Sequence, residues 1–282
     1  MSSRLLIEVD GSGGKATAGM AIQDDLFGQG PAAHLAVETD YGEVGKGASR
    51  AHYVLAENGS EYLIKGPAFT PEHPTVGGNE WVAARLADAL GLPVLDHRIA
   101  TMGGQLFFAS AWMLGPSFSP ALDESLFQRC RNRGRAYDVV VFDAWLANYD
   151  RHHENLVARR VARGSDEHLL LLNDHSHLLV GPGGPASGEQ LLARLDAPPG
   201  AYVSLSFVRS SIVSAERLGQ ALGMVEALTD DFVREVVRST PDELLPSDAR
   251  EAYEDFLTQR RLRLRELYRK HKETFPNLDG DV

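Results

Sequence analysis

Three polar side chains in the middle of the chain carry atoms that suit phosphate chemistry. Asp150 and Asn155 lie five residues apart in a polar loop, and Asp174 follows nineteen residues after Asn155, at the end of an apolar run. A carboxylate can position or deprotonate an attacking hydroxyl. Carboxylate and amide oxygens are also the hard ligands that Mg²⁺ binds. The residue types and their spacing therefore favour phosphoryl transfer.

A second group of candidate residues lies upstream. Lys65 ends an apolar run typical of a strand, and its ammonium group can contact a phosphate as a point charge. Glu80 stands in the first turn of an expected helix, where it can pair with Lys65 and hold it in place. An earlier turn contains Gly45, Gly47 and Ser49, and its backbone N–H groups can lie over phosphate oxygens. These residues are candidates for binding the phosphates of a nucleotide.

The glycine-rich stretch near the N-terminus does not fit a phosphate-binding loop of the Walker type. That motif needs a glycine where Val9 stands, and a Ser or Thr where Ala16 stands. We interpret residues 11–15 as a flexible turn.

The first part of the chain predicts a small antiparallel sheet with one helix. Asn58-Gly59, a strong hairpin signal, separates strands expected at residues 53–56 and 62–65. The helix is expected to begin at Asn79, a good N-cap, and to end at Leu90 before a glycine. Further strands are expected at residues 5–9, 94–100 and 105–111, with a glycine-bearing turn at residues 41–50.

The second part predicts mainly helices, and a run of Gly115, Pro116 and Ser117 marks the boundary between the two parts. Hydrophobic periodicity places helices at residues 120–131, 136–147, 215–228, 230–238 and 247–272, with an apolar strand at residues 169–173. We predict an α+β fold with two lobes and a cleft between them. The expected division is an unassigned N-terminal extension (residues 1–40), a nucleotide-binding N-lobe (41–114) and a helical C-lobe (115–282).

Composition and charge restrict the class of protein. The longest apolar runs of the 282 residues are too short to span a bilayer. The net charge of −11 argues against direct binding of nucleic acid or of an anionic membrane. The N-terminal residues do not resemble a secretory signal, so a cytoplasmic location is expected. The single cysteine, Cys130, excludes an internal disulfide, and the basic run at residues 260–265 is interpreted as a solvated helix face.

Motifs from both parts of the chain resemble one known family. Lys65 ends the run Glu-Tyr-Leu-Ile-Lys, and Glu80 follows Asn79 in a helix that ends with Leu-Gly-Leu-Pro93. The run Phe-Asp-Ala-Trp-Leu-Ala-Asn-Tyr-Asp-Arg-His, residues 142–152, precedes Asn155. From about residue 45 to residue 180 the chain resembles the HipA-like kinases, and phosphatidylinositol kinases carry a similar Asp-Arg-His-x-x-Asn loop.

The resemblance implies a protein-kinase-like fold and transfer of the γ-phosphate of ATP, with Mg²⁺, to a hydroxyl acceptor. The acceptor is expected to be a protein serine or threonine, since the family includes protein serine kinases, and a partner protein could regulate the enzyme. The implied roles are phosphate orientation by Lys65 and Glu80, catalysis by Asp150 with Arg151 and His152 beside it, Mg²⁺ ligation by Asn155 and Asp174, and support from Asp143.

Three alternatives stay open. The same fold could act on a lipid headgroup or a small alcohol. A transition-metal phosphoesterase could be built from the side chains of His152, His153, His175 and His177, together with Asp150 and Asp174. The chain could also be a catalytically inactive module that binds a nucleotide.

Overall fold

A computed structural model of the chain describes residues 34–45, 49–111, 118–119, 121–179, 188–202 and 204–282. Residues Ala33–Val282 form one compact unit. The strand expected at residues 5–9 and the boundary expected at residues 115–117 lie outside the described residues.

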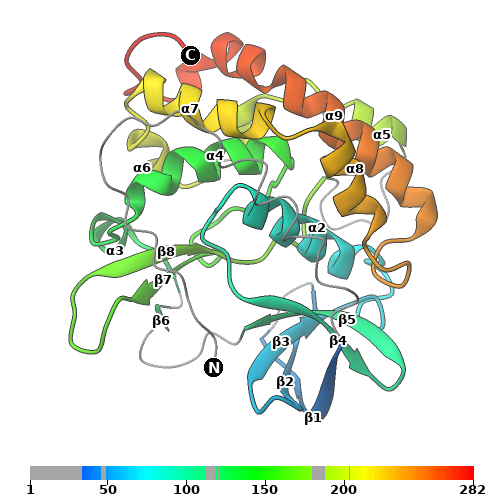
Figure 1. Cartoon of the computed structure of the whole chain (residues 1–282). Coiled ribbons are helices and arrows are strands. Elements are labelled where there is room, and N and C mark those ends of the chain that lie inside the picture. Colours follow the sequence, from blue (N-terminus) through cyan, green and yellow to red (C-terminus); the bar gives the residue numbers. More distant parts are fainter. Residues whose placement is uncertain (1–33, 46–48, 112–117, 120, 180–187, 203) are drawn as a thin grey trace. The chain divides into compact units, whose positions relative to one another are not determined.

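A five-stranded barrel forms the N-terminal part of this unit (Figure 1). Its strands, in the spatial order β1-β2-β3-β5-β4, are β1 (Leu35–Glu43), β2 (His52–Ala56), β3 (Glu61–Lys65), β5 (Gln105–Ala111) and β4 (His97–Met102). The predicted hairpin around Gly59 is confirmed by the antiparallel pairing of β2 with β3. The predicted sheet is wrong in one respect, because β1 pairs in parallel with β4 and so closes the barrel. Residues 41–43, expected in a turn, belong to β1.

Alternating side chains fill the interior of the barrel. Val54, Ile64, Phe107 and Ala109 are fully buried, and they come from three neighbouring strands. Period-two alternation is what a sheet with one buried face requires. This packing fixes β3, whose last residue is Lys65.

Helix α2 (Val76–Ala89) begins three residues earlier than predicted, with Thr75 in place of Asn79 as its N-cap. Its first turn contains Gly77 and Gly78 because the backbone before α9 passes very close. A Cβ at Gly78 would lie 2.6 Å from the carbonyl oxygen of Leu244. Close packing therefore explains why these two glycines occur in a helix, although glycine has a low helix propensity.

A second, three-stranded sheet lies beyond the barrel, in the order β6 (Phe118–Ser119), β7 (Leu156–Arg160) and β8 (His168–Leu172). The strand predicted at residues 169–173 is β8, shifted by one residue. Strand β7 was not predicted; it pairs with β8 in an antiparallel hairpin that directly follows the polar loop of Asp150 and Asn155.

The remaining described elements are helices. They are α3 (Glu124–Gln128), α4 (Ala136–Trp145), α5 (Gly188–Leu192), α6 (Ser206–Ser210), α7 (Ala215–Glu226), α8 (Asp230–Arg238) and α9 (Ser247–Lys270), with short 3₁₀ turns η1 (Arg133–Arg135), η2 (Pro199–Tyr202) and η3 (Lys272–Thr274). The predictions for α4, α7, α8 and α9 are confirmed to within two residues, whereas α3 is shorter than predicted and α5 and α6 were missed. No described helix is long and apolar enough to cross a membrane.

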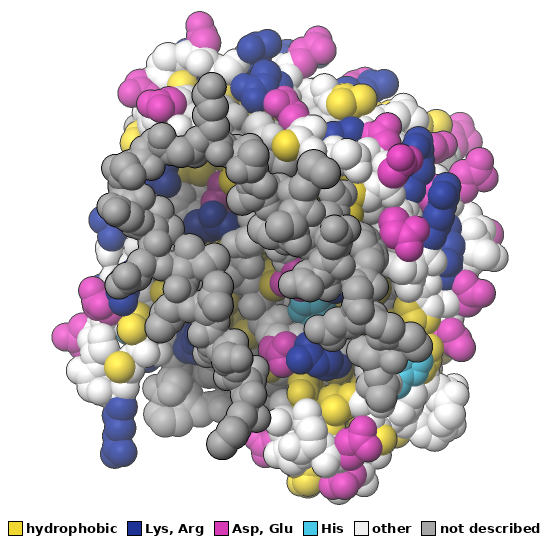
Figure 2. Space-filling model, in the orientation of Figure 1, with side chains coloured by type: hydrophobic (Ala, Val, Ile, Leu, Met, Phe, Trp, Pro, Cys, Tyr) yellow, Lys and Arg dark blue, Asp and Glu magenta, His cyan; other side chains and the backbone are white. Residues whose placement is uncertain are grey.

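The interpretation of residues 260–265 as a solvated helix face is wrong for the first two arginines. Arg260 is fully buried in α9 and donates to the carbonyl oxygens of Ala144 and Leu195, at 2.6 and 2.7 Å. Arg261 is also buried and donates to carbonyl oxygens at the end of α7 and beyond it. The exposed faces of α8 and α9 do carry basic and acidic side chains interspersed (Figure 2).

Candidate active site

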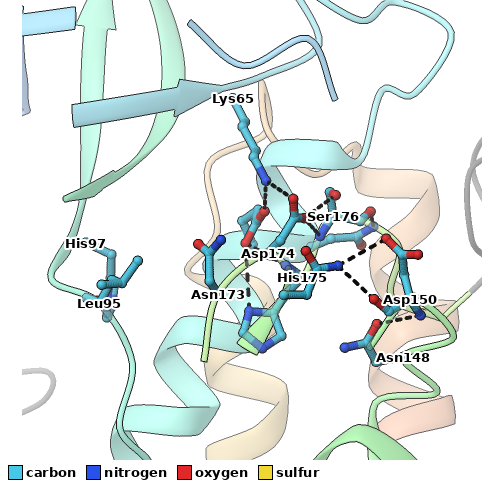
Figure 3. Close-up of polar contacts among 12 residues, drawn as sticks. Lys65, Leu95, His97, Asn148, Asp150, Asn173, Asp174, His175 and Ser176 are labelled. Atoms are coloured by element: carbon cyan, nitrogen blue, oxygen red, sulfur yellow. Dashed lines mark hydrogen bonds and ion pairs between the residues drawn. The ribbon is translucent and has the colours of Figure 1, made fainter. Parts of the chain in front are cut away.

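One ammonium group joins two carboxylates where the barrel meets the helical part. The Nζ atom of Lys65 lies 2.5 Å from Oε1 of Glu80 and 2.9 Å from Oδ2 of Asp174. Figure 3 shows Lys65 extending from its strand toward Asp174. The structure thus brings together three predicted site residues from β3, from α2 and from the segment after β8.

Backbone geometry holds the two carboxylates in place. The N–H group of His175 donates to Oε2 of Glu80 at 2.9 Å. Asp174 has a positive φ of 54°, in the left-handed region that costs energy for residues other than glycine. Its Oδ1 accepts hydrogen bonds from the N–H and the hydroxyl of Ser176. This sharp turn at the end of β8 directs the carboxylate of Asp174 to Lys65.

Burial and neighbouring charges shift the pKa values of these groups in different directions. Burial alone would lower the pKa of Lys65, but Asp174 and Glu80 hold that pKa above its usual value. Burial would raise the pKa of Asp174, but Lys65 and Ser176 hold it well below its usual range. Burial raises the pKa of Glu80 to about 7, against the opposing effect of Lys65. Asp174 is therefore the firmly ionised partner of Lys65, whereas burial opposes the ionisation of Glu80.

The loop after α4 presents Asp150 to solvent. Its start is fixed by Ala147, which has a φ of 50°, and by the buried side chain of Asn148, whose Oδ1 accepts the N–H of Asp150 at 3.2 Å. The amide nitrogen of Asn155 donates to the carbonyl oxygen of Asp150 at 2.7 Å and to its Oδ2 at 3.2 Å. These bonds leave the amide oxygen of Asn155 as its remaining acceptor. The predicted pair of Asp150 and Asn155 is therefore a direct contact.

The structure places Arg151 differently from its predicted catalytic role. Its side chain is 2% exposed and forms a two-pronged ion pair with Asp143, at 2.8 and 3.0 Å. The Nη1 atom of Arg151 donates to the carbonyl oxygens of Asn155 and Asn173. Arg151 is oriented toward the protein interior, and Asp143 supports the loop by anchoring this guanidinium.

Two histidines lie beside the carboxylate of Asp150. The Nε2 atom of His152 is 3.8 Å from Oδ1, and Nε2 of His177 is 3.8 Å from Oδ2. The Nδ1 atom of His177 is buried and has no hydrogen-bond partner among the described residues. His152 is thus at the site as predicted. His177 had been considered only as a metal ligand.

The predicted phosphate-covering turn is described only in part. Gly45 has a φ of +77°, a conformation that favours glycine, and a Cβ there would meet no atom within 4 Å. Ser49 is buried. Gly47 lies outside the described residues, so the phosphate-binding role of this turn stays a prediction.

The transition-metal alternative finds no support in the described residues. No group of three or more His, Cys, Asp or Glu side chains there is arranged to hold a metal ion. His175 is buried at the site, its ring packs edge-on to Phe142, and its Nε2 has no partner among the described residues. Burial, reinforced by the charge of Arg151, lowers the pKa of His175 well below its usual value, so the imidazole is neutral.

Sequence reasoning missed several residues that hold the site together. Asn148 had a signal, since it begins the Asn-x-Asp-Arg-His run. Asn79, expected as a helix cap, instead donates to the carbonyl oxygen of Ser176 and accepts from the hydroxyl of Tyr253 in α9. Tyr253 belongs to no local motif, so its contact with the site segment could not be found from the sequence.

Comparisons with known proteins give a family for part of the chain and a similar fold. A family model described as HipA-like kinase matches residues 41–176, the range that contains every residue predicted for the kinase site. No curated protein matches the chain. The crystal structure of a Helicobacter pylori proinflammatory kinase, CtkA, is similar with a TM-score of 0.55 and 15% identity, covering 83% of this chain and 94% of that chain.

Two further solved structures are more distant. HipA of Shewanella oneidensis MR-1, from a complex with HipB and operator DNA, has a TM-score of 0.42 at 14% identity, covering 79% of this chain and 61% of that chain. The Golgi casein kinase has a TM-score of 0.43 at 11% identity, covering 89% of this chain and 77% of that chain. These two similarities are too low to carry an argument.

The similarity to CtkA shows a kinase-like fold, as predicted: α+β, with an N-terminal sheet and a helical C-terminal region. The family match covers the barrel strands β2 to β5, α2, the polar loop and Asp174. Residues 41–176 of the chain match the HipA-like kinase family, a family of ATP-dependent phosphotransferases.

Proposed function

We propose that the protein transfers the γ-phosphate of ATP to the hydroxyl group of a protein serine or threonine. The observation that carries this proposal is the bridge from Lys65 to Glu80 and Asp174, at 2.5 and 2.9 Å. A buried lysine that is held by a helix glutamate and faces a carboxylate after a strand is the arrangement with which protein kinases position phosphates and metal.

In the proposed reaction, Lys65 keeps its bond to Glu80 and turns from Asp174 to a phosphate oxygen. The acceptor hydroxyl lies against Asp150, which orients it and takes its proton. As the acceptor oxygen bonds to the γ-phosphorus, the bond from that phosphorus to the bridging oxygen breaks and ADP leaves. Asp150 is suited to this step because its carboxylate is 40% exposed and fixed by Asn155.

The side chains of Asn155 and Asp174 fit a magnesium ion. Both offer hard oxygen donors, and the amide nitrogen of Asn155 is turned away in its bonds to Asp150, which leaves the oxygen for a cation. Bound there, Mg²⁺ would neutralise phosphate charge during transfer. We propose these two residues as its ligands.

The serine or threonine acceptor is proposed on family grounds, because the HipA-like kinases include protein serine kinases. A lipid headgroup or a small alcohol is the alternative, and it would use the same site residues. The net charge of −11 is unfavourable for work at an anionic membrane.

The test is incubation with γ-labelled ATP and Mg²⁺, with and without a library of serine-, threonine- and tyrosine-containing peptides, followed by mass spectrometry of protein and peptides. We expect label on serine or threonine. Asp150→Asn should reduce transfer by about 10²- to 10⁴-fold, the range for loss of a general base, while ATP binding stays near the wild-type value. Full activity in that variant would contradict the role of Asp150. Label on lipid or a small alcohol alone would replace the proposed acceptor.

A further inference from the structure

A single buried guanidinium contacts both segments that carry the proposed Mg²⁺ ligands. One terminal nitrogen of Arg151 lies 2.5 Å from the carbonyl oxygen of Asn155 and 2.7 Å from that of Asn173. Asn155 is itself a proposed ligand, and Asn173 immediately precedes the other, Asp174. The N–H of Asn173 also donates to the carbonyl oxygen of Asn155, at 3.2 Å. These contacts with the guanidinium of Arg151 therefore fix the backbone distance between Asn155 and Asp174.

The guanidinium is itself fixed from the other side. Its Nε and its second terminal nitrogen donate to the two carboxylate oxygens of Asp143, which is 1% exposed and lies in α4. A planar guanidinium presents its donors in a rigid fork. Holding one side of that fork on Asp143 therefore aims the remaining nitrogen at the two carbonyl oxygens. The positions of α4, the polar loop and the end of β8 are linked through this side chain.

Lysine cannot reproduce this arrangement. Its ammonium group is a compact point charge on a flexible stem, so it can reach the carboxylate of Asp143 or the two carbonyl oxygens, but not both in the same geometry. A change from Arg151 to Lys keeps the charge and removes the fork, which makes it a specific probe of positioning.

We propose that Arg151 is a positioning residue that sets the distance between the oxygen ligands of the Mg²⁺ ion and so tunes the affinity for the cation. The inference rests on the proposed function of Asn155 and Asp174 as ligands. It assigns to Arg151 a role in metal affinity, whereas the sequence had suggested a role in the chemical step.

The chain offers a matched control for the competing interpretation that Arg151 only stabilises the fold. Arg261 in α9 is also buried, pairs with one carboxylate, Asp230, and donates to two carbonyl oxygens, those of Glu226 and Leu228. All its partners lie at the junction of α7 and α8, away from the ligand segments. Replacing Arg261 by Lys therefore removes the same kind of interaction without touching the site.

The experiment measures binding of Mn²⁺ to the full-length protein with ADP, by the electron paramagnetic resonance signal of free Mn²⁺. We expect Arg151→Lys to weaken Mn²⁺ binding by about 10- to 100-fold, the usual loss when a residue behind a metal ligand is changed. Arg261→Lys should bind Mn²⁺ like the wild type. Circular dichroism and thermal melting of both variants show whether they are folded. Asp143→Asn, which keeps an oxygen acceptor for Arg151 but removes its charge, should weaken Mn²⁺ binding in the same direction by a smaller factor.

Kinetics give a second readout. In Arg151→Lys, the Mg²⁺ concentration needed for half-maximal activity should rise by more than kcat falls, because the cation compensates at high concentration. Wild-type Mn²⁺ affinity in Arg151→Lys, or an equal loss in Arg261→Lys, would overturn the inference while leaving the proposed function intact. A wild-type protein that binds ADP but no Mn²⁺ would contradict the proposed ligands and this inference together.

Discussion

The two halves of the candidate site are held in place by different kinds of interaction. Lys65, Glu80 and Asp174 form a charged cluster in which the lysine and the glutamate are almost fully buried. Asp150 and Asn155 form a loop in which the carboxylate of Asp150 is 40% exposed and accepts a hydrogen bond from the amide of Asn155, while the backbone N–H of Asp150 donates to Asn148. The first half depends on mutual compensation of buried charges, and the second depends on backbone geometry.

Because of this difference, substitutions in the two halves should affect folding stability and catalytic turnover differently. A buried charge without its partner is costly, whereas an exposed carboxylate loses little when it becomes neutral. Substitutions in the buried cluster should therefore destabilise the fold and impair binding together. Substitutions of the exposed carboxylate should impair turnover alone.

The largest effect on stability is expected for Lys65→Met. It leaves the carboxylates of Glu80 and Asp174 facing each other without a cation, and breaking a buried pair in this way costs about 3–5 kcal/mol. The measurement is urea unfolding at pH 8, with Asp150→Asn as the comparison variant, which should lose less than about 0.5 kcal/mol. Equal losses in the two variants would show that the two halves of the site do not differ in this respect.

The same variant has an expected pH dependence. The folded pKa of Glu80, about 7, lies above the ordinary value of 4.5, so the wild-type contribution of Glu80 to stability is complete below pH 4.5 and is lost as the pH rises through 7. Without Lys65 the ionised form of Glu80 is still less favourable. The destabilisation by Lys65→Met should accordingly be smaller at pH 6, where Glu80 takes up a proton, than at pH 8.

The next effect concerns the backbone that brings Glu80 to Lys65. Gly78→Ala would place a methyl group 2.6 Å from the carbonyl oxygen of Leu244 and 2.8 Å from Cβ of Leu245, and should cost about 1–3 kcal/mol by overpacking. Gly223 in α7 provides the control, since a Cβ there meets nothing within 4 Å. Gly223→Ala should stabilise the protein by up to about 1 kcal/mol through helix propensity. Stabilisation by both changes, in thermal melts, would contradict the close contact at Gly78.

Much of the geometry of the site could be predicted from the sequence because it is concentrated in one short motif. Asp150 and Asn155 lie in the same loop, so their spacing already brings them together. Lys65 and Glu80 were paired from their order on a strand and a helix, and the structure places them 2.5 Å apart. Local sequence patterns were sufficient to predict contacts within one loop or between two consecutive elements.

Contacts between distant segments could not be predicted. Arg151 and Arg260 were interpreted as a catalytic side chain and as part of a solvated face, yet both are buried. Their partners are mainly backbone carbonyl oxygens. Every residue type carries the same carbonyl, so the residue type does not indicate whether it accepts such a bond. The parallel pairing of β1 with β4 was not predicted for a similar reason, because the sequence of neither strand indicates which strand it pairs with.

The prediction with the smallest expected effect concerns His175 in the buried half of the site. The backbone N–H of His175 donates to Glu80. Burial lowers the pKa of its imidazole well below the usual value, with the charge of Arg151 acting in the same direction. The unfolded chain therefore binds one more proton than the folded chain as the pH falls below 6.5, and stability decreases in that direction. Between pH 7.5 and 5.5 the loss from this group is about 1.4 kcal/mol. Urea unfolding in metal-free buffer should show that His175→Leu lacks this part of the pH dependence, while the opposite contribution of Glu80 remains in both proteins. Identical pH dependence in the two proteins would mean that His175 takes up a proton in the folded state, and that the buried half of the site is open to water.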